Sequence, residues 1–333
     1  MMFIINNKQK LTKEDNMNKL KKIGLTALAG SLVATSVAYA GALEATGSAQ
    51  MKMENNSASS AGKTIGMANN IYFKGAGETD GGLNVAVSFE LDDGSSSGNA
   101  SGVWDNHSVS VGNDTFGTVT VHGHGGSSAV TALDGTAAGD LWDNGSLLPA
   151  ANAPTDSGAG NNVVVYALPS LIDDVALSLS YASDGTRNEN SIAYSLGYTG
   201  VEGLSVSFGY AENKGTVNVK NEQLVTKASY AVGPITAGYS INQVEKVGAN
   251  SLTVSSMSLS YSLTDSLSLS YGEETFERST KATDIEVSGI SGSYTSGGMV
   301  LALKKNESKN NDHTSTSTNN DPSYWQASLS FAF

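Results

Sequence analysis

The sequence predicts an all-β protein, a sixteen-stranded antiparallel barrel that crosses a membrane. Three observations lead to this fold: side chains alternate between apolar and small polar types, short and long connections take turns, and charge is scarce. Gly is abundant at 37 residues and only 15% of residues are charged, against about a quarter in ordinary soluble proteins. A membrane barrel accounts for this composition, because alternate side chains face lipid while small polar ones line a wet interior.

The first forty residues are expected to direct export. Lysines at positions 19, 21 and 22 precede an apolar run, 23–37, which ends on Ala-Tyr-Ala at 38–40, the small-x-small pattern of a secretory cleavage site. A membrane-anchoring helix is the alternative, but the run is short and no second apolar stretch of that length follows. We expect a non-structural N-terminal extension, a signal peptide and a transmembrane barrel, at residues 1–16, 17–40 and 41–333.

Sixteen segments downstream of the leader alternate as half-buried strands do. Successive side chains of a strand point to opposite faces, so in the last segment Trp325, Leu329 and Phe331 share one face while Gln326 and Ser328 share the other. A closing strand of a soluble sandwich follows the same rule, so this segment alone does not decide the fold. An even number of strands can close into a barrel without an unpaired edge. The predicted strands are 43–53, 66–75, 82–91, 104–112, 115–123, 161–168, 174–183, 189–199, 202–213, 221–232, 234–243, 251–263, 265–276, 282–295, 299–307 and 322–333.

The connections alternate in length. Short joins, most of them rich in turn residues, occur at 113–114, 169–173, 200–201, 233, 264 and 296–298. Longer polar segments occur at 92–103, 123–160, 183–188, 213–220, 244–250, 277–281 and 309–321. Brief periplasmic turns and extended outer loops of a barrel produce this rhythm, whereas a sandwich gives no reason for it.

Two of the predicted strands change parity part-way. In 251–263, Leu252 and Val254 are out of phase with Met257, and 282–295 contains a similar change, so we expect a β-bulge in each. Tyrosines near strand ends are expected in the girdles at the two membrane surfaces, although core packing could also place them there. These tyrosines are Tyr166, Tyr181, Tyr198, Tyr210, Tyr230, Tyr261 and Tyr271.

Three segments resemble the trimeric general porins of Gram-negative bacteria, particularly the alphaproteobacterial kind. Residues 109–121, Val-Ser-Val-Gly-Asn-Asp-Thr-Phe-Gly-Thr-Val-Thr-Val, resemble their hairpin of Val-Gly, turn and Phe-Gly-Thr-Val. Residues 162–169, Asn-Val-Val-Val-Tyr-Ala-Leu-Pro, resemble their Asn-Ser-x-x-Tyr-x-Ser-Pro strand, and Phe333 matches the terminal signal read by the barrel-assembly machinery during insertion. The resemblance implies a sixteen-stranded barrel, a homotrimer, and a long third outer loop folded into the pore. The longest predicted connection, 123–160, follows the fifth strand, where that loop belongs.

The chain departs from this family at the expected constriction. Ala-Ala-Gly-Asp-Leu-Trp-Asp-Asn-Gly at 137–145 stands where the family usually has a Pro-Glu-Phe-Gly-Gly-Asp type signature. The wall arginine cluster of enterobacterial porins is missing, since Arg187 and Arg278 are the only arginines after the predicted leader. The pore electrostatics therefore cannot be copied from the family.

Charged residues on the inward loop and on polar strand faces are the candidate pore residues, because fixed charges in a narrow aqueous pore set ion preference. The predicted constriction carboxylates are Asp134, Asp140 and Asp143. The predicted wall residues are Lys52, Lys74, Glu90, His122 and Lys227. The loop acids could instead be merely solvated, and Lys52 could reach the rim.

Other classes of function find little support. His122 and His124 lie two residues apart without a nearby carboxylate triad, and Asp92-Asp93-Gly94 does not fit a calcium loop, so we expect no metal site and no cofactor. No Ser stands in a nucleophile-elbow context, so an enzyme is not expected. The formal net charge of −13 argues against nucleic acid as a partner. Loose binding of divalent cations at the acidic outer rim stays open.

The sequence thus predicts a passive diffusion channel of the bacterial outer membrane for small hydrophilic solutes and ions, mildly cation-selective. Its expected surroundings are outer-membrane lipid and lipopolysaccharide. Two alternatives stay open: a solute-specific channel in which the long loop holds binding groups, and a structural or adhesive surface protein with loops rich in Ser, Thr and Asn, such as 314–320.

Overall fold

A computed structural model describes most of the chain after the predicted leader. The described residues are 43–57, 62–92, 104–148, 152–154, 160–183, 190–214, 220–246, 251–314 and 321–333. The expected N-terminal extension and signal peptide lie outside these residues, as does most of the Ser/Thr/Asn-rich segment 314–320.

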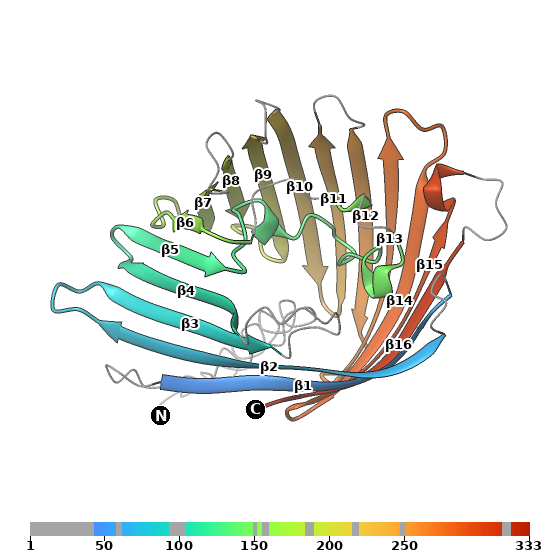
Figure 1. Ribbon diagram of the computed structural model, residues 1–333, viewed down its shortest axis with the longest axis horizontal. Helices are drawn as coiled ribbons and strands as arrows, with labels where there is room; N and C mark the ends of the chain where they lie inside the picture. Colours follow the sequence, from blue (N-terminus) through green and yellow to red (C-terminus); the bar gives the residue numbers. More distant parts are fainter. Residues whose placement is uncertain are drawn as a thin grey trace, which may run out of the picture.

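Sixteen antiparallel strands form one closed barrel, in which each strand pairs with its neighbours in sequence and the first pairs with the last (Figure 1). This confirms the predicted fold; the first two strands extend further than predicted. The strands are β1 (Leu43–Asn56), β2 (Lys63–Glu78), β3 (Asn84–Asp92), β4 (Trp104–Asn113), β5 (Gly117–His124), β6 (Val163–Ala167), β7 (Val175–Ser183), β8 (Asn190–Tyr198), β9 (Leu204–Lys214), β10 (Lys220–Val232), β11 (Ile235–Glu245), β12 (Leu252–Ser262), β13 (Leu267–Arg278), β14 (Ile285–Ser296), β15 (Met299–Lys309) and β16 (Ser323–Ala332).

The alternation of side chains determines which face of each strand looks outward. In β11, Ile235 and Tyr239 are exposed on the outside, while Ser240 and Asn242 are buried inside. An outer surface of this apolar kind is suited to lipid, because the closed ladder leaves no backbone group unpaired there. No helix among the described residues is long and apolar enough to cross a membrane.

The two predicted bulges are wrong. Strand β12 pairs with β11 in continuous register from Val244 opposite Leu252 to Ile235 opposite Tyr261, and β14 pairs with both neighbours without a shift. Leu252 and the other out-of-phase apolar residues instead point into the barrel, where they are buried. Register shifts occur elsewhere, between β3 and β4 and between β4 and β5.

The inner loop connects β5 to β6, and its described residues are 125–148, 152–154 and 160–162. These residues fold inside the barrel and cover the inward apolar residues (Figure 1). The described part of the loop includes the short 3-10 helices η1 (Thr131–Leu133) and η2 (Asn144–Ser146). At one end it packs Ala129 and Val130 against β8, β9 and β10. At the other end it packs Trp142, Leu147 and Leu148 against β12, β13, β14 and β16. The change of parity in β12 and β14 thus marks the residues that form a hydrophobic core between the inner loop and the barrel wall.

Candidate functional site: the inner loop and the facing wall

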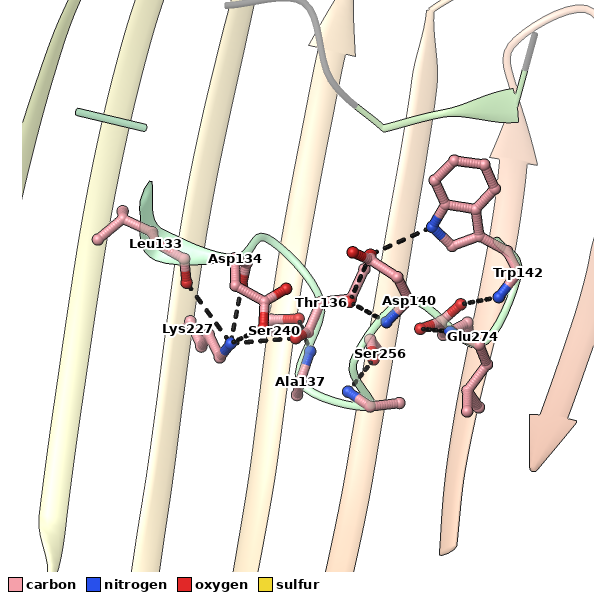
Figure 2. Close-up of polar contacts among 12 residues, drawn as sticks. Leu133, Asp134, Thr136, Ala137, Asp140, Trp142, Lys227, Ser240, Ser256 and Glu274 are labelled. Carbon is pink, nitrogen blue, oxygen red and sulfur yellow. Dashed lines mark hydrogen bonds and ion pairs between the residues drawn. The ribbon is translucent and has the colours of Figure 1, made fainter. Parts of the chain in front are cut away.

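Polar side chains of the barrel wall accept hydrogen bonds from the backbone N–H groups of the inner loop. Ala137 and Ala138 donate their N–H groups to the hydroxyls of Ser240 and Ser256, each over 2.9 Å (Figure 2). A loop buried against a wall must find partners for its backbone groups. Small inward serines, selected by the period-two pattern, supply them.

Glu274 is the most deeply buried acid of this contact, with 1% of its surface exposed. Its two carboxylate oxygens accept the N–H groups of Leu141 at 2.9 Å and Trp142 at 3.1 Å (Figure 2). Asn306 holds the same part of the loop, donating to the Leu141 carbonyl over 3.0 Å. Glu274 therefore fixes the loop at its turn toward β14.

Lys227, predicted as a pore-wall cation, holds the other half of the loop. Its Nζ lies 2.8 Å from the carbonyl oxygen of Asp134, 3.0 Å from that of Thr136 and 3.4 Å from the Asp134 carboxylate (Figure 2). These oxygen atoms of the loop are the partners of the Lys227 ammonium group, so its positive charge mainly stabilises the loop against the wall.

Glycines on the inner wall let the loop approach closely. A Cβ on Gly272 would lie 2.7 Å from the Cβ of Ala138, and a Cβ on Gly209 would lie 2.7 Å from Cδ1 of Leu133. Real Cβ atoms are essentially never that close, so any larger residue at Gly272 would push the loop toward the lumen.

The three predicted constriction carboxylates all lie on the loop, in different surroundings. Asp134 is paired with Lys227. Asp140 has a positive φ of 52°, and its Oδ1 accepts the Thr136 hydroxyl at 2.8 Å and the Trp142 indole N–H at 3.2 Å (Figure 2). Asp143 is exposed.

Asp140 and Asp143 help to line one cavity of about 550 Å³ between the loop and strands β1, β15 and β16, here called the loop-end cavity. Lys52, predicted as a wall residue, lines it too. Its lining residues are Lys52, Glu54, Gly139, Asp140, Asp143, Asn144, Gly145, Ser146, Lys304, Tyr324 and Gln326. The structure thus brings together three of the predicted site residues.

Lys304 and Glu54 belong to this cavity and were not among the predicted site residues. Both sit at inward positions of their strands: Lys304 pairs with Gln326, and Glu54 pairs with Gln326 from the opposite side. The parity of β15 and β1 could have placed them on the polar face. Parity could not have shown the register of these strands, which places Glu54 of β1 and Lys304 of β15 on either side of Gln326 of β16.

The other predicted wall residues lie apart from this cavity. Lys74 stands 5.2 Å from the ring centre of Tyr72. Glu90 is almost fully buried and accepts hydrogen bonds from Asn70 at 3.0 Å and from Asn106. His122 is partly buried on β5. Among the cavity-lining residues of the described chain, none of these three occurs.

The remaining predicted features concern metals and the chain end. Within the described ranges, no three His, Asp or Glu side chains converge as metal ligands; Nδ1 of His124 lies 3.3 Å from Asp105. Phe333 exchanges backbone hydrogen bonds with Gly47, at 2.9 and 3.0 Å, and so joins the chain end to β1.

One family model and several solved structures are similar to this chain. A family model described as Gram-negative porin matches residues 24–264. The anion-selective porin from Comamonas acidovorans superposes with a TM-score of 0.67 at 16% identity, covering 88% of this chain and 99% of that one. In-vitro folded OmpT, an outer-membrane protein of Vibrio cholerae, superposes with a TM-score of 0.68 at 14% identity, covering 89% and 98%. No curated protein gives a significant match.

Proposed function

Because the chain belongs to the Gram-negative porin family, we propose that it forms a water-filled channel through which small hydrophilic solutes and ions diffuse passively across the outer membrane. The observation that carries this proposal is the inner loop, which lies inside a closed barrel and is held to its wall by Glu274 and Lys227. A loop so placed narrows the lumen without filling it with a domain. Solutes that fit would pass down their gradient, and charge at the loop would bias which ions do so.

We propose that the channel mildly prefers cations over anions. Lys227 is surrounded by loop oxygens and Lys52 is paired with Glu54 at 3.0 Å, whereas the carboxylate side chain of Asp143 is exposed. The fold itself does not dictate the sign, since one structurally similar porin is described as anion-selective.

Purified protein in planar bilayers should give stable single-channel conductance in KCl, and its reversal potential under a KCl gradient should indicate a modest preference for K⁺. Asp143→Asn should move that potential toward the non-selective value, because it removes an exposed negative charge at the loop. Asp80→Asn, in the turn between β2 and β3, is the control and should leave it unchanged. A reversal potential on the anion side would overturn the cation preference, and absence of conductance would overturn the channel and favour a structural surface role.

We also propose that three copies assemble through the outer face of β1 to β5. Tyrosines favour the boundary of lipid and water, and the exposed ones are confined to later strands: Tyr181, Tyr194, Tyr198, Tyr230, Tyr239, Tyr261, Tyr271 and Tyr294. Over the described part of β1 to β5, the exposed large apolar residues include no tyrosine, and Trp104 on β4 is their one exposed tryptophan. A surface covered by another protein chain has no need of an interfacial girdle.

Replacing Met51 and Met67, which pair on the outer face of β1 and β2, by Asn should convert most of the oligomer to monomer. The polar amides would be buried without partners in a protein interface. Electrophoretic mobility of unheated samples measures the oligomer. Ile192→Asn with Leu196→Asn, on the outer face of β8, is the matched control and should leave the oligomer in place. Equal behaviour of the two double variants would contradict this interface.

A further inference from the structure

The loop-end cavity presents opposite charges from two sides. The barrel wall contributes the ammonium groups of Lys52 and Lys304, together with the Glu54 carboxylate that pairs with Lys52, and the inner loop contributes the carboxyl groups of Asp140 and Asp143. Its volume of about 550 Å³ lies within the range of roughly 300–1,000 Å³ usual for small-molecule sites.

The wall ammonium groups are held in position by other wall groups. Lys52 Nζ lies 3.0 Å from the Glu54 carboxylate, which also accepts the Tyr324 hydroxyl at 2.6 Å. Lys304 Nζ stands 5.6 Å from the centre of the Tyr324 ring. Side chains fixed in advance lose less conformational entropy when they bind a ligand.

The loop side is also ordered around its acids. Asp140 is fixed through Thr136 and Trp142, and Asn144 donates to the Asp140 carbonyl at 3.1 Å while accepting from Lys304. Asp143, next to this fixed turn, is exposed and can reach a ligand.

We propose that the loop-end cavity binds small zwitterions, namely α-amino acids or short peptides, during their passage through the channel. The ligand carboxylate would lie toward Lys52 and Lys304, and its ammonium group toward Asp143 and Asp140. A simple anion would be attracted by one side and repelled by the other, and a simple cation likewise. A zwitterion satisfies both sides at once, because it carries one charge of each sign.

This proposal rests on the proposed channel function, and one experiment separates the two. Single-channel current in KCl is recorded with increasing L-serine, a zwitterion, and with three probes: N-acetyl-serinamide, acetate and methylammonium. L-serine should reduce the current saturably, with a half-blocking concentration about two- to fivefold below that of each probe, the factor expected from one partly exposed ion pair. Conductance in KCl without any selective block by L-serine would overturn the zwitterion site and leave the channel standing.

Variants test the two sides of the cavity independently. Asp143→Asn is isosteric at an exposed position, and Lys304→Gln removes one wall charge; each should raise the half-blocking concentration of L-serine about two- to fivefold. Lys305→Gln is the matched control, because the neighbouring lysine points outward, where it pairs with Glu307 at 2.6 Å. The proposal fails if Asp143→Asn retains the parental block, or if Lys305→Gln weakens the block as much as Lys304→Gln does.

Discussion

Replacing Glu274 by Ala should release the inner loop from the wall and give a channel with larger and less steady conductance. The buried N–H groups of Leu141 and Trp142 would lose their acceptors, and each unsatisfied group costs about 1–3 kcal/mol. The loop would therefore lose roughly 2–6 kcal/mol of anchoring, enough to populate positions away from β13. Single-channel recording in KCl measures both the mean current and its fluctuations.

Glu273→Ala is the control for this prediction. Glu273 directly precedes Glu274 on β13 and faces outward. It accepts a hydrogen bond from the Tyr271 hydroxyl rather than from the loop. Its removal should leave the current as in the parent. Glu274→Gln, which keeps one acceptor oxygen, should lie between the two. A parental conductance for Glu274→Ala would show that the loop is held without this carboxylate.

Leu259→Arg should be the most damaging single change on the outer surface. Leu259 is 52% exposed and lies between Met257 and Tyr261 on the outward face of β12. Arginine near the middle of a bilayer costs a barrel about 2–4 kcal/mol. The free energy of unfolding in lipid vesicles, followed by denaturant titration, should fall by about that amount.

Ser260→Arg, one residue further along β12, separates charge from position. Its side chain points into the barrel, where Ser260 donates to the Thr236 carbonyl, so water can solvate the new guanidinium. The unfolding free energy should change far less than for Leu259→Arg, although the current could be reduced. If both substitutions were equally tolerated, the outer face of β12 would not be in lipid.

The sequence was sufficient to predict the barrel, because alternation is a local property that each strand displays separately. It also located the inner loop, since a connection as long as 123–160 stands out among short ones. The misinterpretation of Leu252 and Val254 as evidence of a bulge has a physical cause. Periodicity tells which residues share a face, but not what covers that face. Here the cover is Trp142 and its neighbours, which are remote in sequence.

Lys227 is a second residue whose face, but not whose contacts, could be predicted from the sequence. Parity placed its ammonium group inside the barrel correctly, yet its contacts with Asp134 and Thr136 make it an anchor of the loop. Glu274 also shares the polar face by parity, and nothing local distinguishes it from other inward acids. Only the path of the loop decides which wall groups meet its backbone and which meet water.

Closure of the ring through β1 and β16 imposes an order of events on biogenesis. Met51 pairs with Leu329, and Gly47 with Phe333, so the first strand has no permanent partner on one side until translation of β16 is complete. Such distant pairing is slow compared with hairpin formation. Until β16 is in place, the free edge of β1 presents unpaired N–H and C=O groups, to which strands of other chains can hydrogen-bond. Closure of the barrel through β16 therefore competes with association between chains.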